Sequence, residues 1–274
     1  MGNVVVYRIQ GSDLERLPIE ADTLDEATLK TAHGTYTVFR LYSGRRVLRL
    51  DRHLARMRRS AEALGMPYPH SDVWLRDVVR RAVEESGIDI PRVRLTVPFS
   101  APDAALVALE PFSPPPPEVY AHGVRVGLAH DTRERPDVKD SRFIEKRVAL
   151  QSDMAGVYEI MLTDEQGRIL EGTGSNFYAV LGGELRTAGE GMLEGIARSI
   201  LLQIAPRVLP VVLEPVTVSD LPRLDEAMLT SASRGIVPVV EVGGVTIGSG
   251  LPGPFTARLG AAYDAQVEAE LEPL

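Results

Sequence analysis

The chain has 274 residues, a formal net charge of −8 and no cysteine. That length allows one large domain or two modest ones, and the lack of cysteine excludes disulfides and thiolate zinc sites. The negative charge argues against binding to nucleic acid, whose phosphates attract basic faces. No apolar run is long enough to cross a bilayer, and the first residues lack a signal-peptide pattern, so we expect a cytoplasmic protein with no membrane partner.

The first part of the chain alternates strand patterns with two helical patterns. Strands are predicted over residues 3–9, 35–42, 46–50, 92–99 and 104–110. A helix is predicted where apolar residues recur at helical spacing from Leu54 to Leu64, with Gly65 as its end. A second helix is predicted between a capping Ser71 and Gly87.

A proline-rich stretch, Pro-Phe-Ser-Pro-Pro-Pro-Pro, follows at residues 111–117. Consecutive prolines cannot continue a helix or a central strand, so this stretch is expected to be extended and stiff. We interpret it as a domain boundary, with a surface loop as the alternative. The predicted division is 1–112, a linker at 111–119, and 120–274.

The second part of the chain is also a mixture of strands and helices. Strands are predicted over residues 123–129, 158–163, 168–171, 176–180, 211–218, 227–231 and 237–247. Helices are predicted near 144–154, 195–205 and 254–271. The fold class is therefore α/β (α+β), with two domains and strands in both.

Several common chemistries have no motif in this chain. It has no P-loop, no G-x-S-x-G elbow, no G-x-G-x-x-G between a strand and a helix, and no H-E-x-x-H pair, so no metal site is expected. Only three of the 30 basic residues are lysines: Lys30, Lys139 and Lys146. Chemistry that requires a primary amine has these three candidates, because arginine stays protonated.

Three groups of motifs occur in a characteristic order. The first is Gly34-Thr-Tyr-Thr-Val-Phe-Arg40 with His53-Leu-Ala-Arg56. The second is Lys139-Asp-Ser-Arg-Phe143 with Tyr158-Glu159 and Leu170-Glu-Gly-Thr-Gly-Ser-Asn-Phe177. The third is Leu193-Glu-Gly-Ile-Ala-Arg198 with the segment 225–233 and Val237-Pro-Val239. In this order, and with a lysine 32 positions before the glutamate, residues 32–258 resemble the class IV aminotransferases.

These relatives are fold-type IV pyridoxal-phosphate enzymes, among them branched-chain and D-amino-acid aminotransferases and 4-amino-4-deoxychorismate lyase. The resemblance implies an N-terminal α/β domain and a C-terminal barrel-like β domain with helices. It also implies a homodimer that binds pyridoxal 5′-phosphate between the domains of each chain.

The resemblance assigns roles to individual residues. Lys139 matches the family's Schiff-base lysine, and Lys146 is the fallback. Glu171 matches the carboxylate that pairs with the pyridine nitrogen of the cofactor. Arg56 matches the phosphate-binding arginine, whose guanidinium fork suits a phosphate dianion.

Two turns match the family's remaining phosphate contacts. The first is Gly195-Ile196-Ala197 at a helix N-terminus, where free N–H groups favour an anion, and the second contains Ser231 and Ala232. Many members have threonine in place of Ala197 and of Ala232, and each lost hydrogen bond is worth about 1 kcal/mol. A somewhat weaker hold on the cofactor follows.

Substrate contacts are harder to assign. Tyr36 and Arg40 lie on one face of a strand that lines the family's active site, and Arg94 and Ser233 are further candidates. Surface or structural roles are the alternative for each. Arg142, Phe143 and Ile144 stand where many members have asparagine or tyrosine, and Thr37 replaces a family glutamate.

The resemblance predicts amino transfer between an amino acid and a 2-oxo acid, with Lys139 moving the proton as general base and acid. A lyase that uses the same cofactor and lysine is one alternative. A catalytically idle member that only binds the cofactor or a partner is another. The motifs do not separate the transaminase from the lyase, whereas dependence on an amino acceptor would.

Overall fold

The computed structural model describes residues 2–274, which divide into two compact units. Unit 1 contains the residues up to Ser113 together with Val138–Lys146 and Glu270–Leu274, and unit 2 contains Pro114–Asp137 and Arg147–Ala269. The first boundary falls inside the predicted linker. The segments 138–146 and 270–274 were expected in the C-terminal domain but belong to unit 1, so the lysine candidates Lys139 and Lys146 lie there too.

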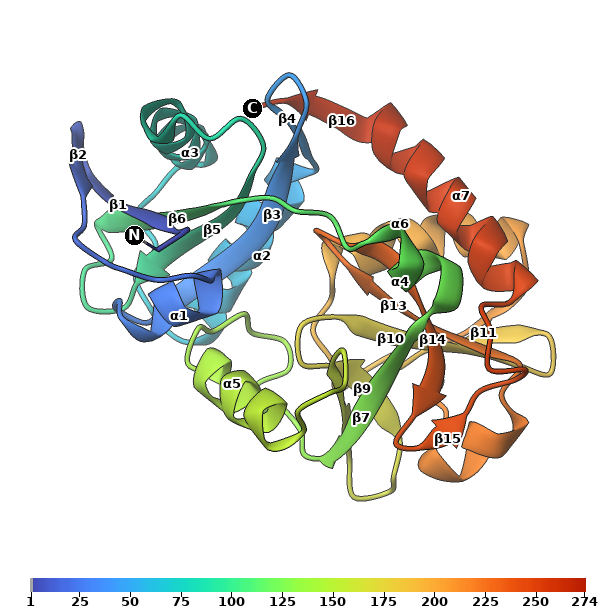
Figure 1. Ribbon diagram of the computed structural model, residues 1–274. Coiled ribbons are helices and arrows are strands. Elements are labelled where there is room, and N and C mark those ends of the chain that lie inside the picture. The colour runs from blue at the N-terminus through green and yellow to red at the C-terminus, as the bar shows by residue number, and fades with distance from the viewer. Residues whose placement is uncertain (1) are drawn as a thin grey trace. The chain divides into compact units, whose positions relative to one another are not determined.

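Unit 1 is built on a seven-stranded sheet in which neighbouring strands are antiparallel (Figure 1). Its order is β16-β4-β3-β5-β6-β1-β2. The strands are β1 (Val5–Gln10), β2 (Asp13–Arg16), β3 (Gly34–Tyr42), β4 (Arg46–Leu48), β5 (Pro91–Pro98), β6 (Ala104–Pro111) and β16 (Leu271–Pro273). The five strands predicted in this part of the sequence are confirmed, with ends shifted by up to two residues.

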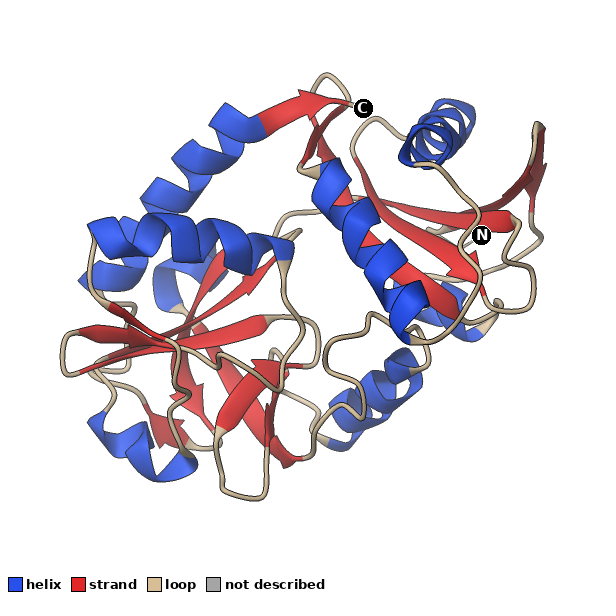
Figure 2. Cartoon of the chain, turned by 180° about the vertical axis from the view of Figure 1, so that it is seen from behind, coloured by secondary structure: helices blue, strands red, loops and turns tan. Residues whose placement is uncertain are grey.

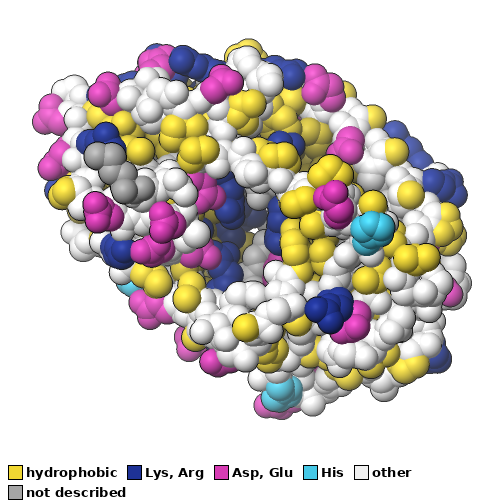
Figure 3. Space-filling model, viewed as in Figure 1, with side chains coloured by type: hydrophobic (Ala, Val, Ile, Leu, Met, Phe, Trp, Pro, Cys, Tyr) yellow, Lys and Arg dark blue, Asp and Glu magenta, His cyan; other side chains and the backbone are white. Residues whose placement is uncertain are grey.

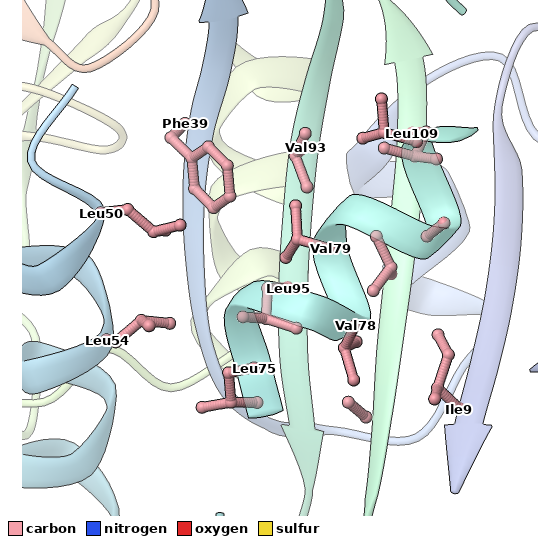
Figure 4. Close-up of a cluster of buried hydrophobic side chains, with 14 of the residues drawn as sticks. Ile9, Phe39, Leu50, Leu54, Leu75, Val78, Val79, Val93, Leu95 and Leu109 are labelled. Carbon is pink, nitrogen blue, oxygen red and sulfur yellow. The ribbon is translucent and has the colours of Figure 1, made fainter. Parts of the chain in front are cut away.

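Two helices, α2 (Leu50–Ala63) and α3 (Asp72–Ser86), cover one face of this sheet. Figure 4 shows Leu75, Val78 and Val79 of α3 pointing at the strands, with side chains of α2 beside them. The α3 ends follow the prediction, because the Ser71 side chain accepts the Trp74 N–H and Gly87 takes the left-handed conformation with φ 68°. The main core of unit 1 lies between these helices and the sheet.

Helix α1 (Leu24–Leu29) covers the opposite face of the sheet and was not predicted. Thr23 caps it by accepting the Glu26 N–H. The spacing Thr23-x-x-Glu26 is the sequence signature of such a cap, so a signal was present. The apolar contacts of Val4, Val6 and Ala108 with Leu24 and Ala27 hold the helix in place.

Unit 2 is built on a nine-stranded sheet that closes into a barrel (Figure 1). The path β10-β13-β14-β7-β8-β9 returns to β10 through the pairing of Asn176 with Glu171. The strands are β7 (Val124–His130), β8 (Ile160–Thr163), β9 (Ile169–Gly172), β10 (Asn176–Leu181), β11 (Glu184–Arg186), β12 (Val211–Val212), β13 (Glu226–Ser231), β14 (Gly235–Val242) and β15 (Val245–Thr246). The predicted mixed fold with a barrel-like domain is therefore confirmed.

Two strand predictions in unit 2 were wrong. The predicted strand 211–218 is only β12, because Thr217 and Asp220 form a capping box that starts the 3₁₀ helix η2 (Val218–Arg223). The predicted strand 237–247 is the hairpin β14–β15, since Gly243 and Gly244 both take positive φ at its turn.

The remaining helices are short or follow the barrel strands. They are α4 (Pro117–His122), α5 (Phe143–Asp153), α6 (Ile196–Ile204), α7 (Pro254–Glu270) and the 3₁₀ helix η1 (Ala205–Arg207). The last proline of the proline-rich stretch starts α4 rather than extending the chain, and proline is well tolerated at a first helical position. The chain leaves α7 directly into β16 (Figure 2).

The helices and the charged side chains of the surface add two observations. None of the helices between residues 2 and 274 is long and apolar enough to span a membrane. On the face drawn in Figure 3, acidic and basic side chains are interspersed with apolar ones.

Candidate functional site

In unit 1, Lys139 lies on a segment that pairs with the start of β3. Its carbonyl accepts the Tyr36 N–H at 3.1 Å, and its own N–H donates to Ser60 Oγ at 3.0 Å. Asp140 forms an isolated β-bridge with Thr35. The Ser141 N–H donates to the Gly34 carbonyl at 3.0 Å, and the Ser141 hydroxyl accepts the Gly34 N–H at 2.9 Å. The lysine backbone is therefore fixed on both sides by elements of unit 1.

The Lys139 side chain packs against an aromatic face. Its Nζ lies 4.7 Å from the centre of the Tyr36 ring, and Tyr36 is 2 % exposed. An ammonium over an aromatic ring is held electrostatically, while a neutral amine in the same place stays in van der Waals contact. Tyr36 thus orients the amine in either protonation state.

Helix α2 presents a buried polar stripe to the same part of unit 1. His53, Arg56 and Ser60 fall at helical spacing on one face and are each at most 5 % exposed. Thr37 of β3 joins them, because its Oγ1 lies 2.6 Å from His53 Nδ1 and accepts Arg56 Nη2 at 3.2 Å. Sequence reasoning found Arg56 but gave no role to His53 or Thr37. The available signal for His53 was the i, i+3, i+7 spacing of the polar residues His53, Arg56 and Ser60.

The field at this stripe is positive. Burial lowers the pKa of His53 well below 6.5, and the charges of Arg56 and Lys139 lower it further. The imidazole is therefore neutral at pH 7, while two cations lie near it. A buried place with this field suits an anion.

Replacing His53 with asparagine should make the unfolding free energy depend less on pH below pH 6.5. The folded-state pKa is depressed, so below pH 6.5 the unfolded chain takes up a proton that the folded chain does not. Wild-type unfolding free energy should therefore fall by up to about 1.4 kcal/mol per pH unit through this group as the pH drops below 6.5. Denaturant unfolding at pH 7.5 and 5.5 measures the difference. The exposed His122→Asn variant is the control and should keep the wild-type slope; an unchanged slope in H53N would contradict the argument.

In unit 2, Glu171 lies at the end of β9 and is 2 % exposed. Its Oε1 accepts Arg133 Nε at 2.7 Å, and its Oε2 accepts the Leu193 N–H at 3.2 Å. Arg133 is itself 7 % exposed and also donates to the Thr173 carbonyl at 3.2 Å. A buried ion pair of this kind keeps the carboxylate ionised and fixes its orientation. Arg133 was missed, since no local pattern in the sequence pairs it with Glu171.

The loop before α6 is tied to the start of β10, which pairs with the strand that carries Glu171. Asn176 donates from Nδ2 to the Leu193 carbonyl at 2.8 Å. A Cβ on Gly195 would lie 2.2 Å from Asn176 Oδ1, so only glycine fits at the start of this helix. Helix α6 begins at Ile196, with no side-chain cap on its first N–H groups, and Ala197 is in its first turn. The Glu-Gly-Thr-Gly-Ser-Asn and Leu-Glu-Gly-Ile-Ala-Arg motifs are thus brought into direct contact.

The other predicted turn of unit 2 lies between β13 and β14. Ser231 ends β13, Ala232 is half-buried and Ser233 is 9 % exposed. The Ser231 Oγ accepts two hydrogen bonds from Arg234, at 2.9 Å from Nε and 3.3 Å from the backbone N–H. Arg234 was not among the predicted site residues.

The basic substrate candidates of unit 1 have contacts of their own. Arg94 is 1 % exposed and binds α1, through Nη1 to the Leu24 carbonyl and Thr28 Oγ1 and through Nη2 to Asp25 at 2.7 Å. These bonds give it a structural role, holding α1 to the sheet. Arg40 is half-buried and stacks over the rings of Tyr42 at 4.1 Å and Phe112 at 4.5 Å.

The stretch after the lysine has a structural role as well. Arg142 pairs with Asp140 and lies 5.2 Å from the centre of the Phe99 ring, while Ile144 is fully buried. Lys146 is half-buried on α5.

Comparison with known proteins agrees with these motifs. The family model described as Amino-transferase class IV matches residues 34–242. The branched-chain-amino-acid aminotransferase of Pseudomonas aeruginosa is 27% identical over 268 residues, covering 89% of this chain and 87% of that protein. The D-alanine aminotransferase of Bacillus licheniformis is 28% identical, covering 95% and 96%. The crystal structure of the T.th. branched-chain amino acid aminotransferase with pyridoxamine 5′-phosphate superposes with a TM-score of 0.80 at 21% identity, covering 98% of each chain.

Proposed function

This chain belongs to the class IV aminotransferases, and we propose that it uses pyridoxal 5′-phosphate bound to Lys139. It is therefore an enzyme that moves an amino group between an amino acid and a 2-oxo acid. The observation that carries the proposal is the fixed position of Lys139, with its backbone bonded to β3 and α2 and its amine over the Tyr36 ring.

The residues present fit this cofactor chemically. Lys139 supplies the amine, and the positive field at the buried stripe of Arg56 and His53 suits the phosphate. Glu171 is a buried carboxylate whose ionised form Arg133 stabilises, and it can pair with a protonated ring nitrogen as well. The N–H groups at the start of α6 and the hydroxyl of Ser231 are further donors for the phosphate.

Each of these residues then has a defined task. When bound, pyridoxal 5′-phosphate supplies a carbonyl carbon for the amino group and a ring that spreads the charge left on the substrate's α-carbon. With the cofactor bound, Lys139 Nζ would take the proton from the substrate's α-carbon and donate it to C4′, the carbonyl carbon of the cofactor. Tyr36 keeps that amine in place, and Glu171 keeps the positive charge on the ring nitrogen.

The proposal extends to assembly, location and substrate contacts. We propose a homodimer in the cytoplasm, with Tyr36, Arg40 and Ser233 among the groups that meet the substrate. Arg94 is the weakest of the substrate candidates, since its guanidinium binds α1.

Dependence on an amino acceptor separates this function from the lyase alternative. With a panel of L- and D-amino acids as donors, product should form only when a 2-oxo acid is added, and one equivalent of new amino acid should appear per donor consumed. Release of a carbon fragment from 4-amino-4-deoxychorismate without any acceptor would instead support the lyase. Cofactor binding without turnover of either substrate would support the idle member.

A further inference from the structure

Arg234 occupies the turn between β13 and β14 and joins two parts of unit 2 that flank the proposed cofactor contacts. Its Nε and its backbone N–H both donate to Ser231 Oγ, at 2.9 and 3.3 Å. Its Nη2 donates to Glu159 Oε2 at 2.7 Å, and its guanidinium carbon lies 5.2 Å from the centre of the Tyr158 ring. One side chain thus contacts a hydroxyl, a carboxylate and an aromatic face.

Glu159 transmits this contact to the turn that follows Glu171. Its side chain is 6 % exposed, and its Oε1 accepts the Gly174 N–H at 2.7 Å and the Ser175 hydroxyl at 2.8 Å. The packing is close, because a Cβ on Gly172 would lie 2.4 Å from the same oxygen. Burial would raise the pKa of Glu159, but the charge of Arg234 and the bonds from Gly174 and Ser175 outweigh it and lower that pKa. The carboxylate is therefore ionised and firmly held.

The contact with Ser231 has a directional consequence. A serine hydroxyl has two acceptor positions and one proton to donate. Arg234 fills both acceptor positions, so the remaining hydrogen-bonding capacity of Ser231 is its O–H donor. A hydroxyl fixed as a donor suits an anion, and an unfixed hydroxyl would spend part of its time turned away from it.

We propose that Arg234 is a positioning residue, which fixes the Ser231 hydroxyl as a donor to the cofactor's phosphate and, through Glu159, ties this turn to the 172–175 turn after Glu171. The inference rests on the proposed function, since it needs a phosphate for Ser231 to meet. Arg234 itself does not touch the reacting atoms. It affects the affinity for the cofactor by orienting Ser231, which contacts the phosphate.

The test is a double-mutant cycle on Arg234→Lys and Ser231→Ala. Lysine keeps the positive charge for Glu159 but lacks the fork that reaches Ser231 at the same time. Each single variant should raise the dissociation constant for pyridoxal 5′-phosphate by about tenfold, the effect of one hydrogen bond to a charged group. The constant is measured by equilibrium dialysis of apoenzyme, with thermal unfolding to show that the variants are folded. The double variant should be no weaker than either single one. Arg223→Lys, in an exposed pair with Asp220, is the matched control and should bind like wild type.

An unchanged constant in R234K, or a second tenfold loss in the double variant, would overturn the proposal. If R234K does not fold, Glu159→Gln gives the second route, because it removes the charge that holds Arg234 and leaves both turns' hydroxyls intact. It should weaken binding several-fold in the wild-type background and not in the S231A background, and equal weakening in both would count against the proposal. Failure of wild type to bind pyridoxal 5′-phosphate would instead overturn the proposed function.

Discussion

Replacing Lys139 with alanine is expected to lower amino transfer by about 10³-fold or more. The amine is assigned both the covalent attachment of the cofactor and the proton transfer at the substrate's α-carbon, and a positioned base alone contributes roughly 10² to 10⁴ in rate. The backbone of residue 139 should stay in place, because its hydrogen bonds to Tyr36 and Ser60 use main-chain atoms. Initial rates with an amino acid and a 2-oxo acid measure the loss.

Lys146→Ala is the matched control for this variant. Lys146 lies on α5, belongs to unit 1 as Lys139 does, and carries the same chemical group. It should keep a rate within a few-fold of wild type. An inactive K146A together with an active K139A would mean that the lysine has been assigned to the wrong position.

Replacing Glu171 with glutamine should lower kcat by on the order of 10²-fold to 10³-fold, the usual effect of removing a preorganised charge from an active site. Glutamine keeps nearly the same shape and can still accept the Leu193 N–H, but it cannot keep a positive charge on the ring nitrogen. It also leaves the buried guanidinium of Arg133 facing a neutral group, so the variant should be less stable by about 1 to 3 kcal/mol.

Two measurements separate these effects in E171Q. Steady-state rates at saturating cofactor report the loss in kcat, and denaturant unfolding reports the loss in stability. Glu165→Gln, an exposed glutamate in the turn before β9, should match wild type in both. A folded E171Q with bound cofactor and wild-type kcat would show that the carboxylate has no part in the reaction.

The elements that could be predicted are those set by local rules. Helix α3 follows from Ser71 and Gly87, whose cap and left-handed conformation are properties of the residues themselves. The strands of unit 1 follow from alternating and apolar runs, because burial of one or both faces leaves that pattern in the sequence. The resemblance named the lysine, the glutamate and the phosphate turns from order and spacing.

What could not be predicted depends on contacts between distant segments. Arg133 meets Glu171 across 38 residues, and Arg234 meets Glu159 across 75, so no window of sequence contains either pair. Arg94 was named as a substrate candidate from its place on a predicted strand, and its guanidinium binds α1, a helix that was not predicted. The last strand, β16, was not predicted and begins at the last residue of the predicted helix 254–271, since its partner β4 lies more than 200 residues away in the sequence.

The most direct test of the account is the site of borohydride labelling. Purified protein with pyridoxal 5′-phosphate should show an absorbance band near the visible edge, and reduction should fix a pyridoxyl group on one peptide. The account predicts that mass mapping finds this group on Lys139. A label on Lys30 or Lys146, or no band and no label after added cofactor, would contradict it.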